Sequence, residues 1–218
     1  VPYMKEKRIS FKDIIDAYNS GNDDDWKALA KKAPIHEVVL GMVVDHLPNP
    51  VEAQKYRIPK IWRGDIESEF GKDLASCNPN GKLGFVITKI VVDPQAGEIS
   101  AGRMFSGTMK KGTEVYLNRQ KQNSRVQQVF VYNGAKRDLV ESVPAGNVIG
   151  IAGVKAFPGE TVTLEPEEPF EAISHLFDPV ITKAIQPEMP GDLPKMIEVL
   201  RQVSKEDPSI KVEINEET

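Results

Sequence analysis

The sequence has few of the features that carry catalysis or membrane insertion. It has one cysteine, Cys77, so no disulfide can form within the chain, and we expect a reducing, cytoplasmic setting. No apolar run approaches the roughly 18 residues of a membrane-spanning helix, so no membrane contact is expected. The histidines His36 and His46 are out of phase on a helix and His175 is remote in sequence, which argues against a metal site.

Catalytic and nucleotide-binding signatures are also missing. The chain has no G-x-x-x-x-G-K-[ST] loop, whose backbone amides would cradle phosphates. Cys77 lies in a turn-rich stretch without a neighbouring His or Lys, and adjacent carboxylates such as Glu167 and Glu168 are typical of a solvated surface. We therefore expect no catalytic residue, no metal site and no cofactor-binding residue in this chain.

Composition indicates an ordinary globular chain with an uneven charge. Of the 218 residues, 40% are apolar and 28% charged, and the formal net charge is −4. Residues 79–130 hold eight basic and three acidic residues, a net charge of +5, whereas residues 131–178 hold three basic and eight acidic residues, a net charge of −5. One part could face an anionic partner; the alternative is two solvated faces of opposite sign.

Residues 84–164 read as short strands separated by tight turns. Runs rich in Val, Ile, Phe and Tyr alternate with turns that contain Pro, Gly or Asn. The expected strands are 85–92, 98–105, 113–118, 125–132, 148–154 and 161–164. Closure removes the exposed edges of a sheet, so we expect a mainly β fold built on a closed six-stranded β-barrel.

Helices are expected on both sides of the strands. Ser10 can cap a helix that ends at 19–21, the acidic run 23–25 suits the start of a second, and residues 35–47 form an apolar third. Residues 51–80 read as a connector in which Tyr56, Ile58, Ile61 and Trp62 could seed a strand. After residue 179 we expect a strand at 180–185, a helix from 192 to 207 and a strand at 210–214.

Four motifs, in order along residues 35–218, resemble a known family. The stretch 93–112, which ends in RMFSGTMKKG, resembles the second domain of translational GTPases. Residues 46–57 (HLPNPVEAQKYR) look like the junction before that domain in archaeal and eukaryotic elongation factor 2. Residues 142–150 (SVPAGNVIG) resemble a late strand of the same domain, and KAIQP at 183–187 followed by DLPKM at 192–196 resembles the opening of a ferredoxin-like third domain.

The resemblance implies a domain organisation and a function. Residues 1–50 would be the C-terminal helical end of the G domain, 51–177 the β-barrel domain II, and 178–218 the first half of domain III, a partial β-α-β unit. The chain, which starts with Val-Pro and lacks the family's nucleotide motifs, would be a fragment that docks on the ribosome without catalysis of its own. The full-length parent would be a cytoplasmic GTPase that uses GTP and Mg²⁺ to translocate tRNA and mRNA in protein synthesis.

Basic side chains on the turns are the candidates for contact with small-subunit ribosomal RNA. They are Lys110, Lys111, Arg119, Lys121 and Arg125. Arg103 is expected to bond backbone carbonyls rather than RNA, and Gly107 and Gly112 to serve turns with positive φ. Two alternatives stay open: a stand-alone β-barrel that binds RNA or protein, and the barrel region of another translational GTPase.

Overall fold

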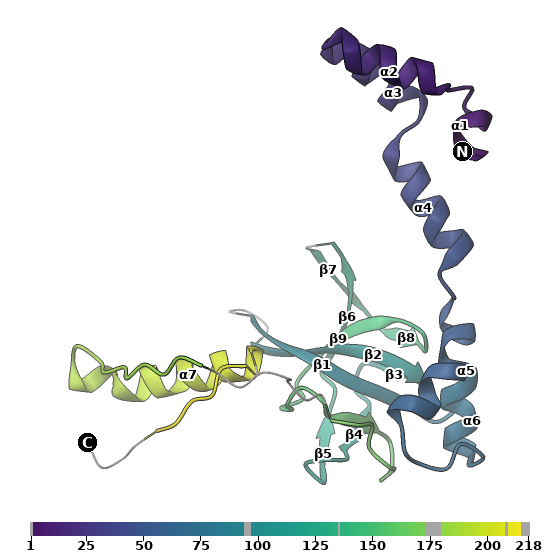
Figure 1. The fold of residues 1–218 in the computed structure, drawn as a ribbon. Helices are drawn as coiled ribbons and strands as arrows, with labels where there is room; N and C mark the ends of the chain where they lie inside the picture. The colour runs from purple at the N-terminus through teal and green to yellow at the C-terminus, as the bar shows by residue number, and fades with distance from the viewer. Residues whose placement is uncertain (1, 94–96, 135, 173–179, 208, 215–218) are drawn as a thin grey trace. The chain divides into compact units, whose positions relative to one another are not determined.

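The computed structural model describes residues 2–93, 97–134, 136–172, 180–207 and 209–214. The chain divides into two compact units, residues 1–49 and 50–218. In the described part of the first unit, the elements are helices α1 (Pro2–Glu6), α2 (Phe11–Ser20), α3 (Asp23–Lys32) and α4 (Ile35–His46). The second unit contains the strands and the remaining helices (Figure 1).

Helix boundaries in the first unit follow the cap residues. The Ser10 hydroxyl accepts a hydrogen bond from the Asp13 amide at 3.2 Å, and the Asp13 carboxylate accepts one from the Ser10 amide at 2.7 Å. This reciprocal pair satisfies two donors that the start of α2 would otherwise leave open. Gly21, with φ of 62°, ends the helix in the left-handed conformation. The predicted helix at residues 10–20 is therefore confirmed.

The second unit is built on one antiparallel sheet in the order β5-β4-β10-β1-β2-β9-β6-β7. Its strands are β1 (Gly84–Asp93), β2 (Gly97–Ser106), β4 (Glu114–Leu117), β5 (Gln122–Arg125), β6 (Gln128–Asn133), β7 (Lys136–Val140), β9 (Val148–Ala152) and β10 (Thr161–Thr163). A separate two-stranded sheet pairs β3 (Thr108–Lys110) with β8 (Ser142–Pro144).

The expectation of a closed six-stranded barrel is wrong, although the mainly β character of this region holds. The eight-stranded sheet is open: it ends at β5 on one side and at β7 on the other. Polar composition protects these edges instead of closure, because β5 reads Gln-Asn-Ser-Arg and β7 begins Lys-Arg-Asp. Charged and polar side chains on an edge strand disfavour pairing with another chain.

A break in register lets β1 place three aliphatic or aromatic residues in one core. The pairing of β1 with β2 shifts between Ile87 and Lys89. Phe85, Ile87 and Ile90 all belong to the main core cluster, although strict alternation would send Ile90 to the opposite face. A bulge at Thr88 thus allows ten residues of β1 to follow the curvature of the sheet while the core stays filled.

Residues 51–80 were predicted to be a connector with a possible strand, and this was wrong. They form α5 (Pro50–Ile61) and α6 (Glu69–Ser76). Ile58 and Trp62 lie four residues apart, so both reach one face and join a second core with Phe70 and Phe105. Pro59 lies inside α5, where its ring removes one backbone donor. Trp62 alone keeps a strand-like contact, an isolated antiparallel bridge to Phe170.

The C-terminal region is helical without the expected strands. A 3₁₀ turn, η1 (Pro190–Asp192), leads into α7 (Leu193–Glu206), as the sequence predicts. The described residues 180–189 and 209–214 hold no strand, so the β-α-β unit is not formed. A strand needs a neighbour to satisfy its backbone groups, and the described residues on either side of α7 do not pair with one another.

Candidate functional site

The basic candidates gather at the two ends of the β4–β5 hairpin, which forms one edge of the sheet. Glu114 pairs with Arg125 at one end and Leu117 pairs with Gln122 at the other. Arg125 therefore lies beside the turn that carries Lys110 and Lys111, whereas Arg119 and Lys121 occupy the turn between the two strands. With four residues in each strand, the two groups are about 10 Å apart along the hairpin.

The first turn is ordered by backbone and side-chain contacts. Gly112 has a φ of 82°, as expected for its turn, and its amide donates to the Val126 carbonyl at 2.8 Å. Its own carbonyl accepts a hydrogen bond from Nε of Arg125 at 3.2 Å. The Lys111 ammonium lies 3.6 Å from Glu141, in an exposed ion pair. Lys110 is exposed at the end of β3. These contacts leave the cationic ends of three side chains at the surface of one turn.

Arg119 differs from the other candidates because its guanidinium group binds backbone oxygens. Nε donates to the Gly159 carbonyl at 2.9 Å, and a terminal nitrogen donates to the Phe170 carbonyl. The planar fork of arginine suits two fixed acceptors. This is the role that the sequence suggested for Arg103. Arg119 therefore fixes the β4–β5 turn to the backbone on both sides of β10, at Gly159 before the strand and Phe170 after it.

A buried carboxylate completes the second turn. Glu160 is only 2% exposed, and its Oε1 accepts hydrogen bonds from the amides of Arg119 and Thr161, at 2.8 and 3.0 Å. Its other oxygen accepts from the Gln120 amide at 3.2 Å. Three backbone amides replace the hydrogen bonds to water that the Glu160 carboxylate loses on burial. Lys121 follows with φ of 53° and an exposed side chain.

Arg103 and Gly107 lie in and beside the β2 strand. Arg103 is inside β2 rather than between two strands, and its guanidinium carbon lies 5.8 Å from the ring centroid of Phe105. Gly107 has a φ of 73°, and a Cβ there would come within 2.7 Å of the Leu83 backbone. Its amide donates to the Asn78 carbonyl at 2.7 Å. Arg103 thus contacts an aromatic ring of its own strand, and Gly107 contacts the backbone that precedes β1.

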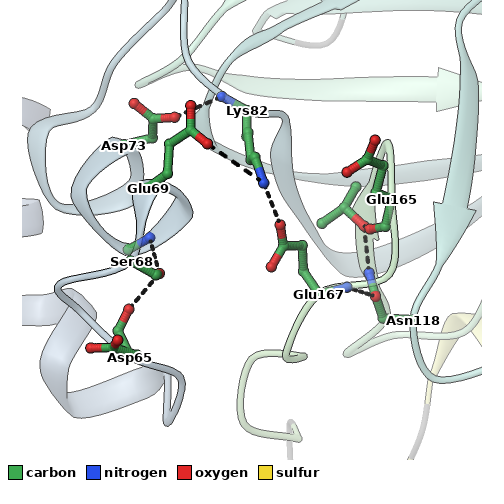
Figure 2. A network of polar contacts seen from close by, with 10 residues as sticks. Asp65, Ser68, Glu69, Asp73, Lys82, Asn118, Glu165 and Glu167 are labelled. Atoms are coloured by element: carbon green, nitrogen blue, oxygen red, sulfur yellow. Dashed lines mark hydrogen bonds and ion pairs between the residues drawn. The ribbon is translucent and has the colours of Figure 1, made fainter.

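Several functional contacts were missed because they depend on residues distant in sequence (Figure 2). The Lys82 ammonium lies 3.2 Å from Glu167 and 3.9 Å from Glu69, and the Lys82 amide donates to the Asp73 carboxylate at 2.8 Å. The hydrogen bond to Glu167 raises the pKa of the Lys82 ammonium. One lysine thus joins α6 to the segment that follows β10.

Two buried amide side chains were missed as well. The Asn118 amide nitrogen donates to the Thr161 carbonyl at 3.0 Å, and its oxygen accepts from the Glu167 amide at 2.8 Å. Gln54 is 1% exposed and donates to the carbonyls of Leu74 and Phe105, at 2.5 and 2.8 Å. A glutamine on the apolar side of a helix is the sequence signal that could have indicated the buried hydrogen bonds of Gln54.

The described residues also limit the chemistry. They contain no group of three or more His, Cys, Asp or Glu side chains that could hold a metal ion. Burial raises the pKa of the Cys77 thiol, with nearby Arg103 acting in the opposite direction, so a buried thiol is held in its unreactive form. Within the same ranges, no helix is long and apolar enough to cross a membrane.

Comparison with known proteins defines the class. A model of elongation factor Tu domain 2 matches residues 97–163, which include most of the sheet. A model of elongation factor G domain III matches residues 177–218. The chain therefore carries, in this order, two kinds of domain that translation elongation factors contain.

Individual relatives narrow the class. The chain is similar to elongation factor 2 of Thermococcus sibiricus (56% identical over 219 residues), Thermococcus kodakarensis (53% over 219) and Methanocaldococcus jannaschii (54% over 221). Each match covers 100% of this chain and 30% of the relative. The chain belongs to the elongation factor 2 family, as the four motifs indicated, and spans 30% of the length of these relatives.

Proposed function

We propose that the chain is a ribosome-docking scaffold within an elongation factor 2. The observation that carries this is the match to elongation factor 2 over 100% of the chain at 50–56% identity. The whole protein would act in the cytoplasm and use GTP with Mg²⁺ to drive translocation of tRNA and mRNA. We assign residues 1–50 to the end of the G domain, 51–177 to domain II and 178–218 to the start of domain III.

The nucleotide would bind outside this chain. The sequence has no phosphate-binding loop, and its polar clusters serve internal contacts such as those of Glu160 and Lys82. A fluorescent GTP analogue titrated into the 218-residue chain should show no saturable binding. Saturation in the micromolar range would contradict the proposal.

The RNA-facing surface would be the β3–β4 turn together with the exposed end of β5. Lys110, Lys111 and Arg125 present three cationic groups there, and Lys121 adds a fourth at the far end of the hairpin. Arg119 is excluded from this set because its guanidinium binds two carbonyls. Phosphate contacts by Lys and Arg are non-specific in sequence, so this surface would position the protein on RNA rather than read bases.

Salt dependence tests this surface directly. Three phosphate contacts give a slope of log K against log salt of roughly −2 to −3. Binding of the chain to small ribosomal subunits should show such a slope, and the variant with Lys110, Lys111 and Arg125 all changed to Gln should bind with a slope of about −1 or shallower, because only Lys121 remains. A matched variant with Lys27, Lys31 and Lys32 changed to Gln removes the same charge from exposed positions of α3. Equal losses in the two variants would show that total charge, not this turn, governs binding.

A further inference from the structure

Two consecutive residues in the last turn of α7 contact one cross-strand pair of the β1–β2 hairpin. The Lys205 ammonium lies 2.7 Å from Oε1 of Glu98, and Oε1 of Glu206 accepts a hydrogen bond from the Val92 amide at 2.6 Å. Val92 and Glu98 are direct partners in the antiparallel ladder. Neighbouring residues on a helix point about 100° apart, so Lys205 reaches β2 while Glu206 reaches β1.

The Val92 amide is available because β1 is longer than its neighbour. Strand β10 pairs with β1 only at Phe85 and Val86, near the start of the strand. The outward-facing backbone groups toward the end of β1 therefore meet no strand in the described part of the sheet. An edge amide of this kind needs an acceptor, and an ionised carboxylate makes a shorter and stronger bond than a neutral group.

Lys205 is the cation that pairs with the Glu98 carboxylate. The side chains of Lys205 and Glu98 are 25% and 23% exposed, and the second carboxylate oxygen of Glu98 is buried without a hydrogen-bond partner among the described residues. Removal of Lys205 would leave a largely desolvated carboxylate uncompensated. Lys205 also lies 5.5 Å from the ring centroid of Phe157, which adds a cation–π contact from a third segment.

The rest of α7 adds little apolar contact. In the described structure none of its residues is buried or joins a core cluster of the sheet: Met196, Ile197, Leu200 and Val203 are half-buried, and Leu193 and Val199 are 44% and 47% exposed. The helix is therefore held to the sheet by polar contacts of its final turn rather than by a packed apolar face. Polar contacts that keep access to water are weakened by salt and are worth less than a buried apolar face.

We propose that Lys205 and Glu206 form a releasable polar clamp, which holds α7 against the β1–β2 hairpin in a docked state and permits a released state. The clamp recognises the Val92–Glu98 pair: a cation binds the carboxylate on β2 and an anion binds the amide on β1. Loss of either contact shifts the ratio of docked to released molecules about tenfold, because each is a hydrogen bond to a charged group, and high salt shifts the ratio in the same direction.

Hydrogen exchange of the Val92 amide reports the clamp, because Glu206 is its acceptor. In the 218-residue chain, Glu206→Ala should speed exchange at Val92 about tenfold while amides of β2 and β9 in the middle of the sheet keep their rates. Lys195→Ala, an exposed change in the first turn of α7, is the matched control and should leave Val92 unaffected. Exchange at Val92 that is identical in the Glu206→Ala variant and the control would overturn the proposal.

Swapping the charges at positions 98 and 205 distinguishes release of α7 from unfolding of the helix. Lys205→Ala should release α7 more strongly than the double change Glu98→Ala with Lys205→Ala, because the single change leaves the Glu98 carboxylate without its cation. Glu98→Lys combined with Lys205→Glu should restore slow exchange at Val92. Circular dichroism of each variant keeps helix melting distinguishable from release. The ion pair between Lys205 and Glu98 would be refuted as part of the clamp by two results together: effects of the single changes that simply add in the double variant, and fast hydrogen exchange at Val92 that persists in the charge-swapped variant.

Discussion

The indole nitrogen of Trp62 donates a hydrogen bond to the carbonyl of Glu168 at 2.7 Å, joining residues 106 positions apart. The contact is one of several between the end of α5 and the segment after β10. The Glu171 amide donates to the Ile61 carbonyl at 3.0 Å, and Arg63 forms an ion pair with Glu171 at 2.6 Å. The chain therefore enters and leaves the sheet unit at one place.

Changing Trp62 tests this junction. Trp62→Phe keeps most of the ring volume but leaves the Glu168 carbonyl without its donor, so we expect a loss of about 1–2 kcal/mol in the free energy of unfolding. Trp62→Ala also removes the edge-to-face contact with Phe70 and should cost about 3–5 kcal/mol. Chemical denaturation of the sheet unit gives both values. Trp26→Phe, at a 43% exposed site on α3, should leave this transition unchanged.

Two glycines with the same backbone conformation should respond differently to alanine. Gly97 and Gly107 have φ of 72° and 73°, but a Cβ on Gly97 meets open space whereas one on Gly107 lies 2.7 Å from the Leu83 Cα. Gly97→Ala should cost about 1 kcal/mol for the left-handed conformation alone. Gly107→Ala should cost about 2–4 kcal/mol because the backbone must also move. Equal losses, measured by thermal unfolding, would show that contact with Leu83 has no energetic weight.

Glu160→Gln should destabilise the β4–β5 turn. The amide group that replaces one carboxylate oxygen is a donor facing backbone donors, so at least one of the three amides bound to Glu160 loses its acceptor. The expected loss is about 1–3 kcal/mol in the free energy of unfolding. Glu168→Gln makes the same chemical change at an exposed position and should be neutral within about 0.5 kcal/mol. A neutral Glu160→Gln would mean that the turn does not need the charge.

Stability should fall in alkaline solution because of Cys77. Burial raises the pKa of the folded thiol above its ordinary value of 9.0, so the unfolded chain releases the proton first. The contribution is complete below about pH 8, declines as the pH passes the unfolded value and is lost once the folded pKa is exceeded. Burial also raises the pKa of the Tyr132 phenol. Comparison with Cys77→Ala isolates the thiol: the variant should lose less stability between pH 8 and 10, and parallel pH profiles would contradict the assignment.

Local sequence signals predicted the helices and strands whose ends are set by residues close by in the sequence. Ser10 with Asp13 marks the start of α2, and Gly97 takes a positive φ as the first residue of β2, because in each case a cap or a positive φ is decided by nearby residues. The two core strands β1 and β2 were found within one residue at each end for the same reason. The apolar pattern of α7 likewise predicted a helix that forms without its expected strand neighbours.

The sequence predictions that were wrong concern features set by contacts between residues far apart in the sequence. Residues 125–132 read as one strand, but the Val126 carbonyl accepts a hydrogen bond from the Gly112 amide and the Gln127 amide donates to the Ala152 carbonyl. These separate backbone contacts divide the stretch between β5 and β6. Ser68, whose hydroxyl accepts a hydrogen bond from the Gly71 amide at 3.0 Å, is a local cap signal for the start of α6. Among the basic candidates, only the acceptors on Gly159 and Phe170 distinguish Arg119, and no local pattern reveals them.

The chain enters and leaves the sheet at Trp62 and Phe170, which contact each other. The sheet with its flanking helices can therefore be moved as a whole into another protein. A folded unit whose two ends lie together can be spliced into a surface loop of another protein without stretching its host. Residues 50–171, which keep α5 whole, should therefore tolerate insertion into a foreign loop through a short linker that spans α5, and they should also tolerate new termini cut at the Asn133–Gly134 turn once the old ends are joined. Evolution can move or duplicate such a unit without redesigning the segments on either side.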